Sequence, residues 1–282
     1  MTTNSNADPE IQTAQPKAWK RFKYPQSLYY YASASFAIIF IFSSIVYLNI
    51  PMERFLGMFG RISNFVVSRY YPPELSYIMD PDYIGSVFDT LKMGFLGAFF
   101  GIILALPLAW FGSWNMTPSH SFAYPVARFL TMSTRAVHET IWAILFVSIL
   151  GFGMFAGVLS LTLFCIGFAG KLLSEEIEGI NMGQVEAIRS SGAGELKVFA
   201  YGVFPQIRVA FTGIAIYTWD VAFRAATVVG FFGAGGMGWY LKRNVLEINT
   251  QRVAAILVSI IALVLLSEIL SAWARARVAK AK

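Results

Sequence analysis

The sequence predicts an all-helical integral membrane protein with six transmembrane helices, and both its composition and its uncharged runs indicate that fold class. Of the 282 residues, 56% are hydrophobic and only 13% are charged, half of the roughly 25% that is typical of a soluble domain. This composition excludes an ordinary soluble domain, a disordered chain and collagen. Uncharged runs recur at lengths that suit helices of about 20 residues, which is what a hydrocarbon core requires.

The net charge of +6 arises from basic residues that lie beside apolar runs. In a soluble chain this charge would suggest a nucleic-acid partner, but next to membrane spans basic residues act as topology signals. We therefore expect membrane lipids around the chain and no nucleic acid. Cys165 is the single cysteine and lies in an apolar run, so one chain forms neither a disulfide framework nor a cysteine metal site, and no metal site is predicted.

The N-terminal region combines a polar tail with a first span. Residues 1–23 are polar, end in a basic cluster and are predicted to form a cytoplasmic tail. Residues 24–52 carry no charge. Because this run exceeds the about 7–15 residues of a signal-peptide core, it predicts a membrane-spanning anchor, the first part of a region at 24–85.

An amphipathic helix is expected after the anchor, closed by Pro72 and Pro73. On a helical wheel its apolar side chains take one side and its arginines another: apolar Phe55, Leu56, Phe59, Ile62 and Val66, basic Arg54, Arg61 and Arg69. The pattern is typical of a helix lying in the membrane interface, here on the extracytoplasmic side. For its role we favour anchoring over substrate capture.

Residues 86–274 are predicted to hold the other five spans, before a basic cytoplasmic tail at 275–282. The expected spans are 86–111, a hairpin of two that starts near 128–135, turns at the glycines of 151–157 and ends at 170, then 209–232 and 253–273. In the first of them, GAFFG at 97–101 allows helices to approach closely. Six spans place both termini, the 112–127 loop and the 171–208 segment in the cytoplasm.

The 171–208 segment is the one long stretch of mixed charge. It predicts a short helix capped by Asn181 and stopped near Gly192, where a left-handed residue redirects the chain. A second helix is expected to end before Pro205. A charged helix-turn-helix between two spans suits contact with a soluble partner, although the spacing alone fits a solvated loop equally well.

Glu186 and Ala187, with Gly192 six residues after the glutamate and Pro205 thirteen after the glycine, resemble the EAA loop of binding-protein-dependent ABC importer permeases. The chain departs from that loop at Ile188, Gly202 and Phe204. The segments RAVHETIWAILFVSILGFGMFAGVLSL, YGVFPQI and YTWDVAFRAATVVGFFGAGGMG are similar to the phosphonate-uptake permeases of that family. The resemblance covers roughly residues 89–273.

The resemblance implies a type I ABC importer permease core of five helices plus an N-terminal helix, in the bacterial plasma membrane with cytoplasmic termini. It implies a homodimer that imports phosphonates or related phosphorus oxyanions by alternating access. The implied partners are an extracytoplasmic substrate-binding protein and a dimer of ATP-binding subunits. The residues implied to couple the chain to the ATPase are Glu186, Ala187, Arg189, Gly192 and Pro205.

ATP chemistry is not expected in this chain. No G-x-x-x-x-G-K-[ST] loop occurs that would hold nucleotide phosphates. We therefore expect ATP and Mg²⁺ in the partner subunits, no cofactor here and no enzymatic activity of the chain itself.

Two ionisable residues fall inside the fifth expected span. Asp220 and Arg224 are four residues apart and therefore share one helical face. A charge at bilayer depth costs about 2.5–3.5 kcal/mol on insertion scales and usually faces a cavity or a partner. One hypothesis is that the pair lines the translocation pathway, where Arg224 attracts an anionic substrate. The other is a structural ion pair within the bundle.

Arg135, His138 and Glu139 lie near the start of the third expected span. Trp142 occupies the position where a metalloprotease HExxH motif needs its second histidine, so a zinc site is not expected. We interpret these charges as packing or gating groups, with Glu139 as a candidate for the pathway.

Five glycines follow the fifth span: Gly230, Gly233, Gly235, Gly236 and Gly238. They include a formal G-x-G-x-x-G, but it follows a membrane helix and not a strand, so it does not indicate a dinucleotide site. The run predicts a non-helical break packed against protein or water. This break is an outer gate in one interpretation and a simple turn in the other.

Three alternatives to a phosphonate permease stay open at this point. The first is a permease of the same core for methionine or a different oxyanion. The second, from another class, is a membrane redox subunit, for which the available axial ligands would be His120 and His138. The third is a membrane scaffold without transport.

Overall fold

The computed structural model describes residues 24–48 and 56–280, and every regular element within those ranges is helical, as predicted. The predicted tail at 1–23, as well as Arg54 and Phe55, lies outside the described residues. The chain divides into two units, residues 1–63 and 64–282, which are described separately.

In the first unit, α1 (Gln26–Tyr47) is a helix within the uncharged run that was predicted to form the anchor. It is apolar, long enough to cross a membrane, and none of it is buried against protein. The next described helix, α3 (Met58–Tyr70), confirms the predicted amphipathic helix and ends before Pro72. Because no residue of α3 is buried, its arginines and its apolar side chains are all presented outward. Its location in a membrane interface stays a prediction.

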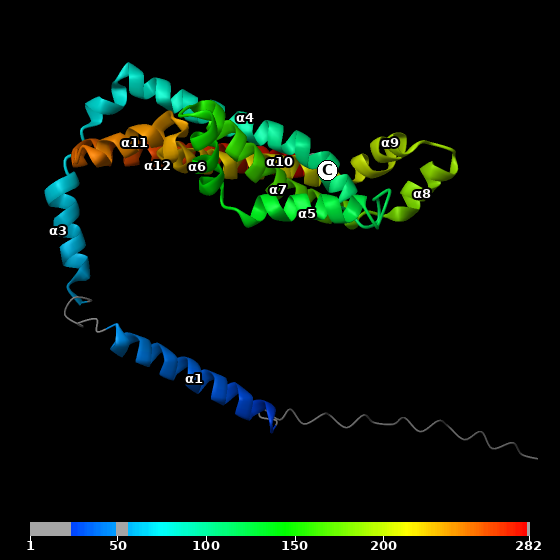
Figure 1. Cartoon of the computed structure of the whole chain (residues 1–282), viewed down its shortest axis with the longest axis horizontal. Helices are drawn as coiled ribbons and strands as arrows, with labels where there is room; N and C mark the ends of the chain where they lie inside the picture. Colours follow the sequence, from blue (N-terminus) through cyan, green and yellow to red (C-terminus); the bar gives the residue numbers. More distant parts are fainter. Residues whose placement is uncertain (1–23, 49–55, 281–282) are drawn as a thin grey trace, which may run out of the picture. The chain divides into compact units, whose positions relative to one another are not determined.

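The second unit is an elongated helical bundle (Figure 1). Its elements are η1 (Leu75–Met79), α4 (Pro81–Phe111), α5 (Ala123–Ala136), α6 (Glu139–Leu150), α7 (Met154–Glu178), α8 (Met182–Ser190), α9 (Glu195–Val198), η2 (Phe199–Val203), α10 (Phe204–Val229), η3 (Gly230–Ala234), α11 (Gly236–Leu246) and α12 (Thr250–Lys280). The helices α4, α7, α10 and α12 run along the bundle, with α8 and α9 at one end and α11 near the other.

The pair of α4 and α7 forms the centre of the bundle, and glycines set its close approach. A Cβ added at Gly97 would lie 2.5 Å from Leu161 Cβ, and one added at Gly101 would overlap the Cβ of Cys165. Since neither position has room for a side chain, the GAFFG spacing acts as the sequence predicts.

The third expected span is not one helix, and here the prediction is wrong. The structure breaks it into α5 and α6, because Val137 and His138 adopt extended backbone conformations. His138 Nδ1 then accepts a hydrogen bond from Thr140 N–H and caps α6. With 12 residues, α6 is shorter than the five described helices that are long and apolar enough to cross a membrane. The predicted hairpin turn does follow it, with φ of +88° at Gly151 and +148° at Gly153.

One predicted helix boundary is also wrong. No helix ends before Pro205, because a π-turn at η2 joins α9 to α10 and the chain stays helical from Glu195 to Val229. The π-turn shifts the hydrogen-bond register, so the missing N–H of Pro205 falls in the first turn of α10, where it is tolerated. The basic segment predicted as a tail at 275–282 is helical as far as Lys280, as the end of α12.

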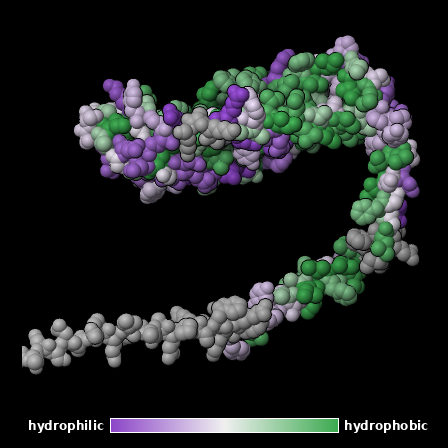
Figure 2. Space-filling view, turned by 180° about the vertical axis from the view of Figure 1, so that it is seen from behind, coloured by the Kyte–Doolittle hydropathy of each residue, from purple (hydrophilic) through white to green (hydrophobic). Residues whose placement is uncertain are grey.

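The polar and apolar surfaces of the second unit are separated along its length. Figure 2 shows hydrophilic residues gathered on the end formed by α8 and α9, and apolar residues over much of the remaining bundle. The α4–α5 connection, α8, α9 and the C-terminal end of α12 lie toward this same end. The structure therefore places on one side the segments that the sequence assigns to one side of the membrane.

Candidate functional site

At one end of the bundle, residues 181–198 form an exposed helix-turn-helix, named here the α8–α9 element. The Asn181 side-chain oxygen accepts a hydrogen bond from Gly183 N–H at 2.9 Å and caps α8, as predicted. Val185 is fully buried in a cluster with Val198 and Ile207 and so holds α8 against the bundle. Gly192 has a φ of +82°, which confirms the predicted left-handed turn.

The residues predicted to couple to an ATPase are exposed, and all but Pro205, which lies at the start of α10, belong to this element. Glu186 and Ala187 on α8 are exposed, and Glu186 makes no ion pair with another described residue. Arg189 forms a two-pronged ion pair with Glu195 across the Gly192 turn, with Nη2 to Oε2 at 2.9 Å and Nε to Oε1 at 3.1 Å. The outer face of α8 therefore offers a carboxylate available to a partner.

Gln206 ties the α8–α9 element to the long helix. Its side-chain oxygen accepts from Asn181 N–H at 3.0 Å, and its side-chain nitrogen donates to Asn181 O at 3.3 Å and to Gly202 O at 2.7 Å. Gly202 in turn packs on Val185: a Cβ added at Gly202 would lie 3.4 Å from the Cα of Val185. The N-terminus of α8 is thus fixed to the start of α10 by one side chain.

Within the span of α10, Asp220 and Arg224 form the predicted pair. Arg224 Nη2 lies 3.0 Å from Asp220 Oδ2, and Ser267 Oγ of α12 donates to Asp220 Oδ1 at 3.1 Å. Only 3% of the Asp220 side chain is exposed, against 40% for Arg224. Glu268 Oε2 lies 3.7 Å from Arg224 Nη1, so the guanidinium contacts a second carboxylate. The aspartate is held by two partners, Arg224 and Ser267, while the guanidinium is partly exposed.

Glu139 lies at the first position of α6, beside the break that follows α5. Its side chain is 14% exposed, and one carboxylate oxygen lies 3.4 Å from His138 Nδ1. A carboxylate in the first turn is favoured there because the N-terminus of a helix is electropositive. The structure does not bring Glu139 into the ion-pair group of Asp220 and Arg224.

The glycine run forms a tight reversal between α10 and α11, as the predicted non-helical break. Gly233, Gly235 and Gly236 have φ of +112°, +90° and +66°. A Cβ at Gly238 would overlap the carbonyl oxygen of Thr227, and one at Gly230 would overlap that of Gly235. Backbone lies directly on backbone here, so no other residue type fits.

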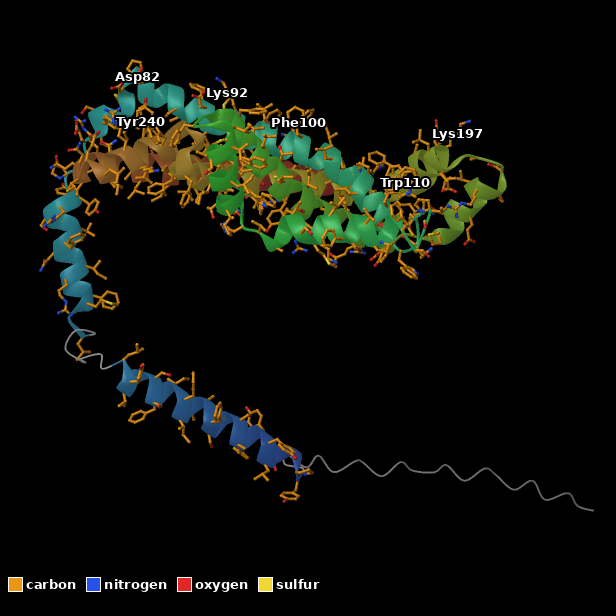
Figure 3. The ribbon with its side chains drawn as sticks, in the orientation of Figure 1. Asp82, Lys92, Phe100, Trp110, Lys197 and Tyr240 are labelled. Atoms are coloured by element: carbon orange, nitrogen blue, oxygen red, sulfur yellow. The ribbon has the colours of Figure 1, made fainter. Side chains whose placement is uncertain are left out.

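Two hydrogen bonds hold this reversal to neighbouring helices. Met237 N–H donates to Thr90 Oγ1 of α4 at 2.9 Å, and Gly153 N–H in the α6–α7 turn donates to Gly233 O at 3.2 Å. The reversal therefore joins three separate parts of the chain at the end of the bundle away from the α8–α9 element. Figure 3 marks the two ends, with Lys197 on α9 at one and Asp82 and Tyr240 at the other.

The predicted residues thus form three groups along the bundle: the α8–α9 element, the Asp220–Arg224 pair and the glycine reversal. Among the residues that the structure describes, no group of three or more His, Cys, Asp or Glu side chains is arranged to hold a metal ion.

Comparison with known proteins decides the family. The model of the family described as "Binding-protein-dependent transport system inner membrane component" matches residues 94–280. The chain belongs to this family. The phosphite transport system permease protein PtxC of Stutzerimonas stutzeri is 39% identical over 199 residues, which are 68% of this chain and 72% of that protein. The phosphate-import permease protein PhnE of Mycolicibacterium smegmatis is 34% identical over 227 residues, which are 80% of this chain and 42% of that protein.

A solved structure of the MetNI methionine ABC transporter, in an inward-facing conformation, confirms the fold of this binding-protein-dependent permease. A chain of it matches with a TM-score of 0.60 at 21% identity, over 70% of this chain and 95% of that one. The expected type I ABC importer permease fold is therefore correct. As a permease component of such a transporter, the chain is a multi-pass membrane protein that works with ATPase and substrate-binding partners.

Three polar residues of this permease were not predicted from its sequence: Gln206, Ser267 and Thr90. Each binds a group far away in the chain, by 25, 47 and 147 residues respectively. The signal available for Ser267 and Thr90 was a polar side chain within an apolar helix. Gln206 directly follows Pro205, so the EAA-like segment itself ends beside it.

Proposed function

We propose that two copies of the chain form the translocation pathway of an ATP-driven importer of phosphonates or related phosphorus oxyanions. The relatives named for phosphite transport and for phosphate import support this substrate class. ATP and Mg²⁺ belong to the partner ATPase dimer, and an extracytoplasmic binding protein delivers the substrate. Both termini and the α8–α9 element lie in the cytoplasm.

The observation that carries the proposal is the unequal exposure of the Asp220–Arg224 pair. Asp220 is buried and fixed by Ser267, while 40% of the Arg224 side chain is exposed. Arginine recognises phosphate-like groups through parallel N–H donors, so an exposed guanidinium at membrane depth is suited to an anion passing along α10. Asp220 and Glu268 hold it in place and keep its attraction weak enough for release.

Coupling follows from the other two groups of residues. The outward carboxylate of Glu186, next to Ala187 and Arg189, contacts the ATPase, and the Gly192 turn sets the angle of α8. The glycine reversal at 230–238 closes the pathway at the opposite end of the bundle. Glu139 lines the same pathway near the start of α6. Closure of the ATPase dimer moves the α8–α9 element, and the bundle opens on its other side.

A pair of variants separates a pathway role from a structural one. Arg224→Gln leaves Asp220 buried without its partner, so we expect a loss of stability of about 3–5 kcal/mol together with loss of uptake. The double variant Asp220→Asn with Arg224→Gln removes both charges and is expected to recover thermal stability, but not uptake. Arg208→Gln, at the exposed start of α10, is the control. Full uptake and coupled ATPase activity in the double variant would contradict the pathway role.

The substrate is tested with the reconstituted complex. We expect ATPase activity that depends on the binding protein to rise with phosphonate, phosphite or phosphate and not with methionine. Methionine is the comparison of choice because the structural neighbour is a methionine transporter. Stimulation by methionine alone would replace the proposed substrate class and leave the importer function standing.

A further inference from the structure

The turn between α11 and α12 holds an isoleucine in a conformation that normally requires glycine. Ile248 has a φ of +58°, and among the residues that the structure describes no other non-glycine has a positive φ. It follows Glu247, the C-cap of α11, at the position where a left-handed glycine ends many helices. A side chain in this conformation crowds the backbone, and a β-branched one does so most. The fold of the turn therefore gives no reason for an isoleucine here.

Two backbone hydrogen bonds identify the turn as a Schellman motif. Ile248 N–H donates to Val245 O at 3.2 Å, and Asn249 N–H donates to Asn244 O at 3.0 Å. Asn249 Nδ2 also donates to Glu247 Oε2 at 3.1 Å. Because these bonds form only when the residue after the C-cap is left-handed, they hold the isoleucine in its unfavourable conformation.

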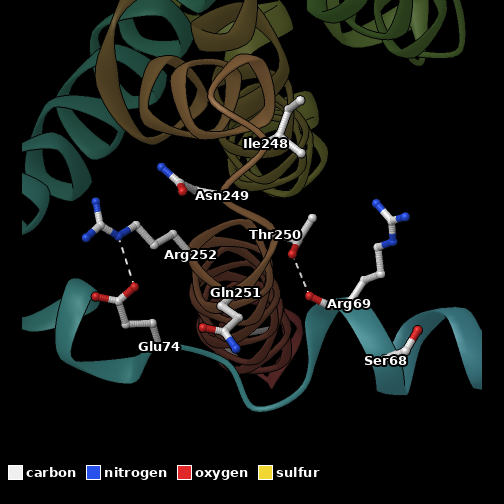
Figure 4. A pocket seen from close by; sticks show the side chains of 8 residues that line it. All are labelled: Ser68, Arg69, Glu74, Ile248, Asn249, Thr250, Gln251 and Arg252. Carbon is white, nitrogen blue, oxygen red and sulfur yellow. Dashed lines mark hydrogen bonds and ion pairs between the residues drawn. The ribbon is translucent and has the colours of Figure 1, made fainter.

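The start of α12 is bound to the segment around the end of α3, which holds the turn from its other side. Thr250 Oγ1 donates to Arg69 O at 2.5 Å. Arg252 Nε donates to Glu74 Oε2 at 2.9 Å. Figure 4 shows both contacts, with Ile248 on the other side of the turn from the Arg252–Glu74 pair. The turn is therefore fixed at both of its ends.

The side chains that this turn presents are apolar and exposed. Ile248 is 74% exposed, and Leu246, the last residue of α11, is 73% exposed. Burial within the chain therefore does little to offset the strain at Ile248. Strained conformations persist where the surrounding structure imposes them, and they cluster at sites of binding or switching. The strain here holds an apolar side chain outward at a fixed place.

The turn lies among charges, which distinguishes it from the lipid-facing surface. Four of the eleven residues from 242 to 252 are charged: Lys242, Arg243, Glu247 and Arg252. Arg243 Nε donates to Glu247 Oε1 at 2.9 Å, and this hydrogen bond lowers the pKa of Glu247. Charges are costly in the hydrocarbon core, so lipid tails do not cover the turn. Apolar side chains that stay exposed outside the hydrocarbon are typical of a contact with another protein.

We propose that Leu246 and Ile248 are a docking contact for the extracytoplasmic substrate-binding protein, which receives them in an apolar depression. The proposal rests on the proposed function. That function places the ATPase at the α8–α9 element, and the turn lies at the opposite end of the bundle (Figure 1), which is left for the other partner. A fixed turn loses little conformational entropy on binding. Because α11 begins within the glycine reversal and ends at this turn, a protein docked here contacts the helix that leaves the proposed gate.

The first test uses the transporter with its ATPase subunits in nanodiscs, together with its own substrate-binding protein. Ile248→Gly removes both the strain and the side chain. We expect the thermal midpoint of the permease to rise by roughly 2–4 °C. The affinity for the binding protein is expected to fall about tenfold, the effect of losing one buried aliphatic side chain. Binding is measured with and without methylphosphonate, so the result does not depend on the proposed substrate class.

Two further variants make the result specific to the turn. Leu246→Ala is expected to weaken binding by a similar factor and to leave the midpoint unchanged, because this residue is helical and unstrained. Leu75→Ala, in η1 and 54% exposed, is the control and is expected to change binding less than about twofold. The proposal is overturned if Ile248→Gly and Leu246→Ala bind no more weakly than Leu75→Ala. A lower midpoint for Ile248→Gly also overturns it, because the isoleucine would then stabilise the fold.

A labelled variant separates this proposal from the proposed function. Val245→Cys lies beside the pair at a position that is 45% exposed, whereas the native Cys165 is fully buried. A membrane-impermeant, environment-sensitive maleimide is added to right-side-out vesicles, and the labelled protein is purified into nanodiscs. We expect labelling from outside, and a blue shift of the emission when the binding protein is added.

The outcomes of this labelling have different consequences. Labelling without the shift overturns the docking contact and leaves the importer function standing. An emission that is already blue before the binding protein is added shows that lipid covers the turn, with the same consequence. A failure to label from outside overturns the orientation on which the docking contact and the proposed function both depend.

Discussion

Two glycine turns of this permease use the same residue type for opposite reasons. Around Gly192, in the α8–α9 element, a Cβ would meet no atom within 4 Å, and the only demand is the φ of +82°. In the reversal at 230–238, three glycines at positive φ lie between Gly230 and Gly238, whose missing Cβ atoms let backbone touch backbone. The first turn is open and constrained by its dihedral angle alone, whereas the second is constrained by packing. An open turn can change its angle without repacking a core, and a closed one cannot.

The largest expected effect is at the packed turn. Gly238→Ala places a Cβ onto the Thr227 carbonyl oxygen and within 2.6 Å of Gly230 C. Since backbone atoms have little freedom to move, we expect a loss of stability at or above about 3 kcal/mol, the upper end for overpacking, seen as a lower thermal midpoint of the purified protein. Gly213→Ala, in α10 with nothing within 4 Å, is the control and should be neutral or slightly stabilising. Equal midpoints for the two variants would show that the reversal is loose.

An intermediate effect is expected at the open turn. Gly192→Ala meets no steric clash but places alanine in a left-handed conformation, at about 1–2 kcal/mol. We expect a modest fall in the thermal midpoint and a larger fall in coupled ATPase activity, because the angle of α8 changes. Gly194→Ala is the matched control, two residues away with a φ of −68° and open space. If both variants couple normally, the angle of this turn does not matter for coupling.

The smallest effect is expected at the exposed ion pair across the open turn. The side chains of Arg189 and Glu195 are 42% and 54% exposed, and such pairs contribute about 0–1 kcal/mol. Arg189→Gln should therefore leave the thermal midpoint almost unchanged. A double-mutant cycle with Glu195→Gln measures the coupling energy of the pair. A value above about 1 kcal/mol would show that the turn is more rigid than its open surroundings imply.

The sequence alone was sufficient for those features that depend on near neighbours in the chain. The Asn181 cap, the left-handed Gly192 and the spacing of Asp220 and Arg224 each involve residues within one or two helical turns, so pattern and propensity determine them. The long apolar helices follow from hydropathy in the same way. The functional assignments of these residues stay predictions, to be tested by the variants above.

The features that sequence analysis missed depend on distant contacts or on competing local chemistry. The break at His138 replaced a continuous span because the imidazole caps α6 itself. The π-turn at 199–203 places Pro205 in the first turn of α10, so the proline does not end the helix. At the start of α12, Thr250 donates a hydrogen bond to the carbonyl oxygen of Arg69, 181 residues away in the chain. No local sequence pattern predicts such a distant contact.

The continuous helix from Glu195 to Val229 has a mechanical consequence. With a rise of about 1.5 Å per residue, its 35 residues make a helix about 50 Å long. Lys197 and Arg224 are parts of that one helix, so a rotation of the helix about its axis at one residue would also move the other. At the π-turn the helix is wound differently from the α-helices on either side. A shift of its hydrogen-bond register by one residue would convert a displacement of α9 into a rotation of α10 about its axis.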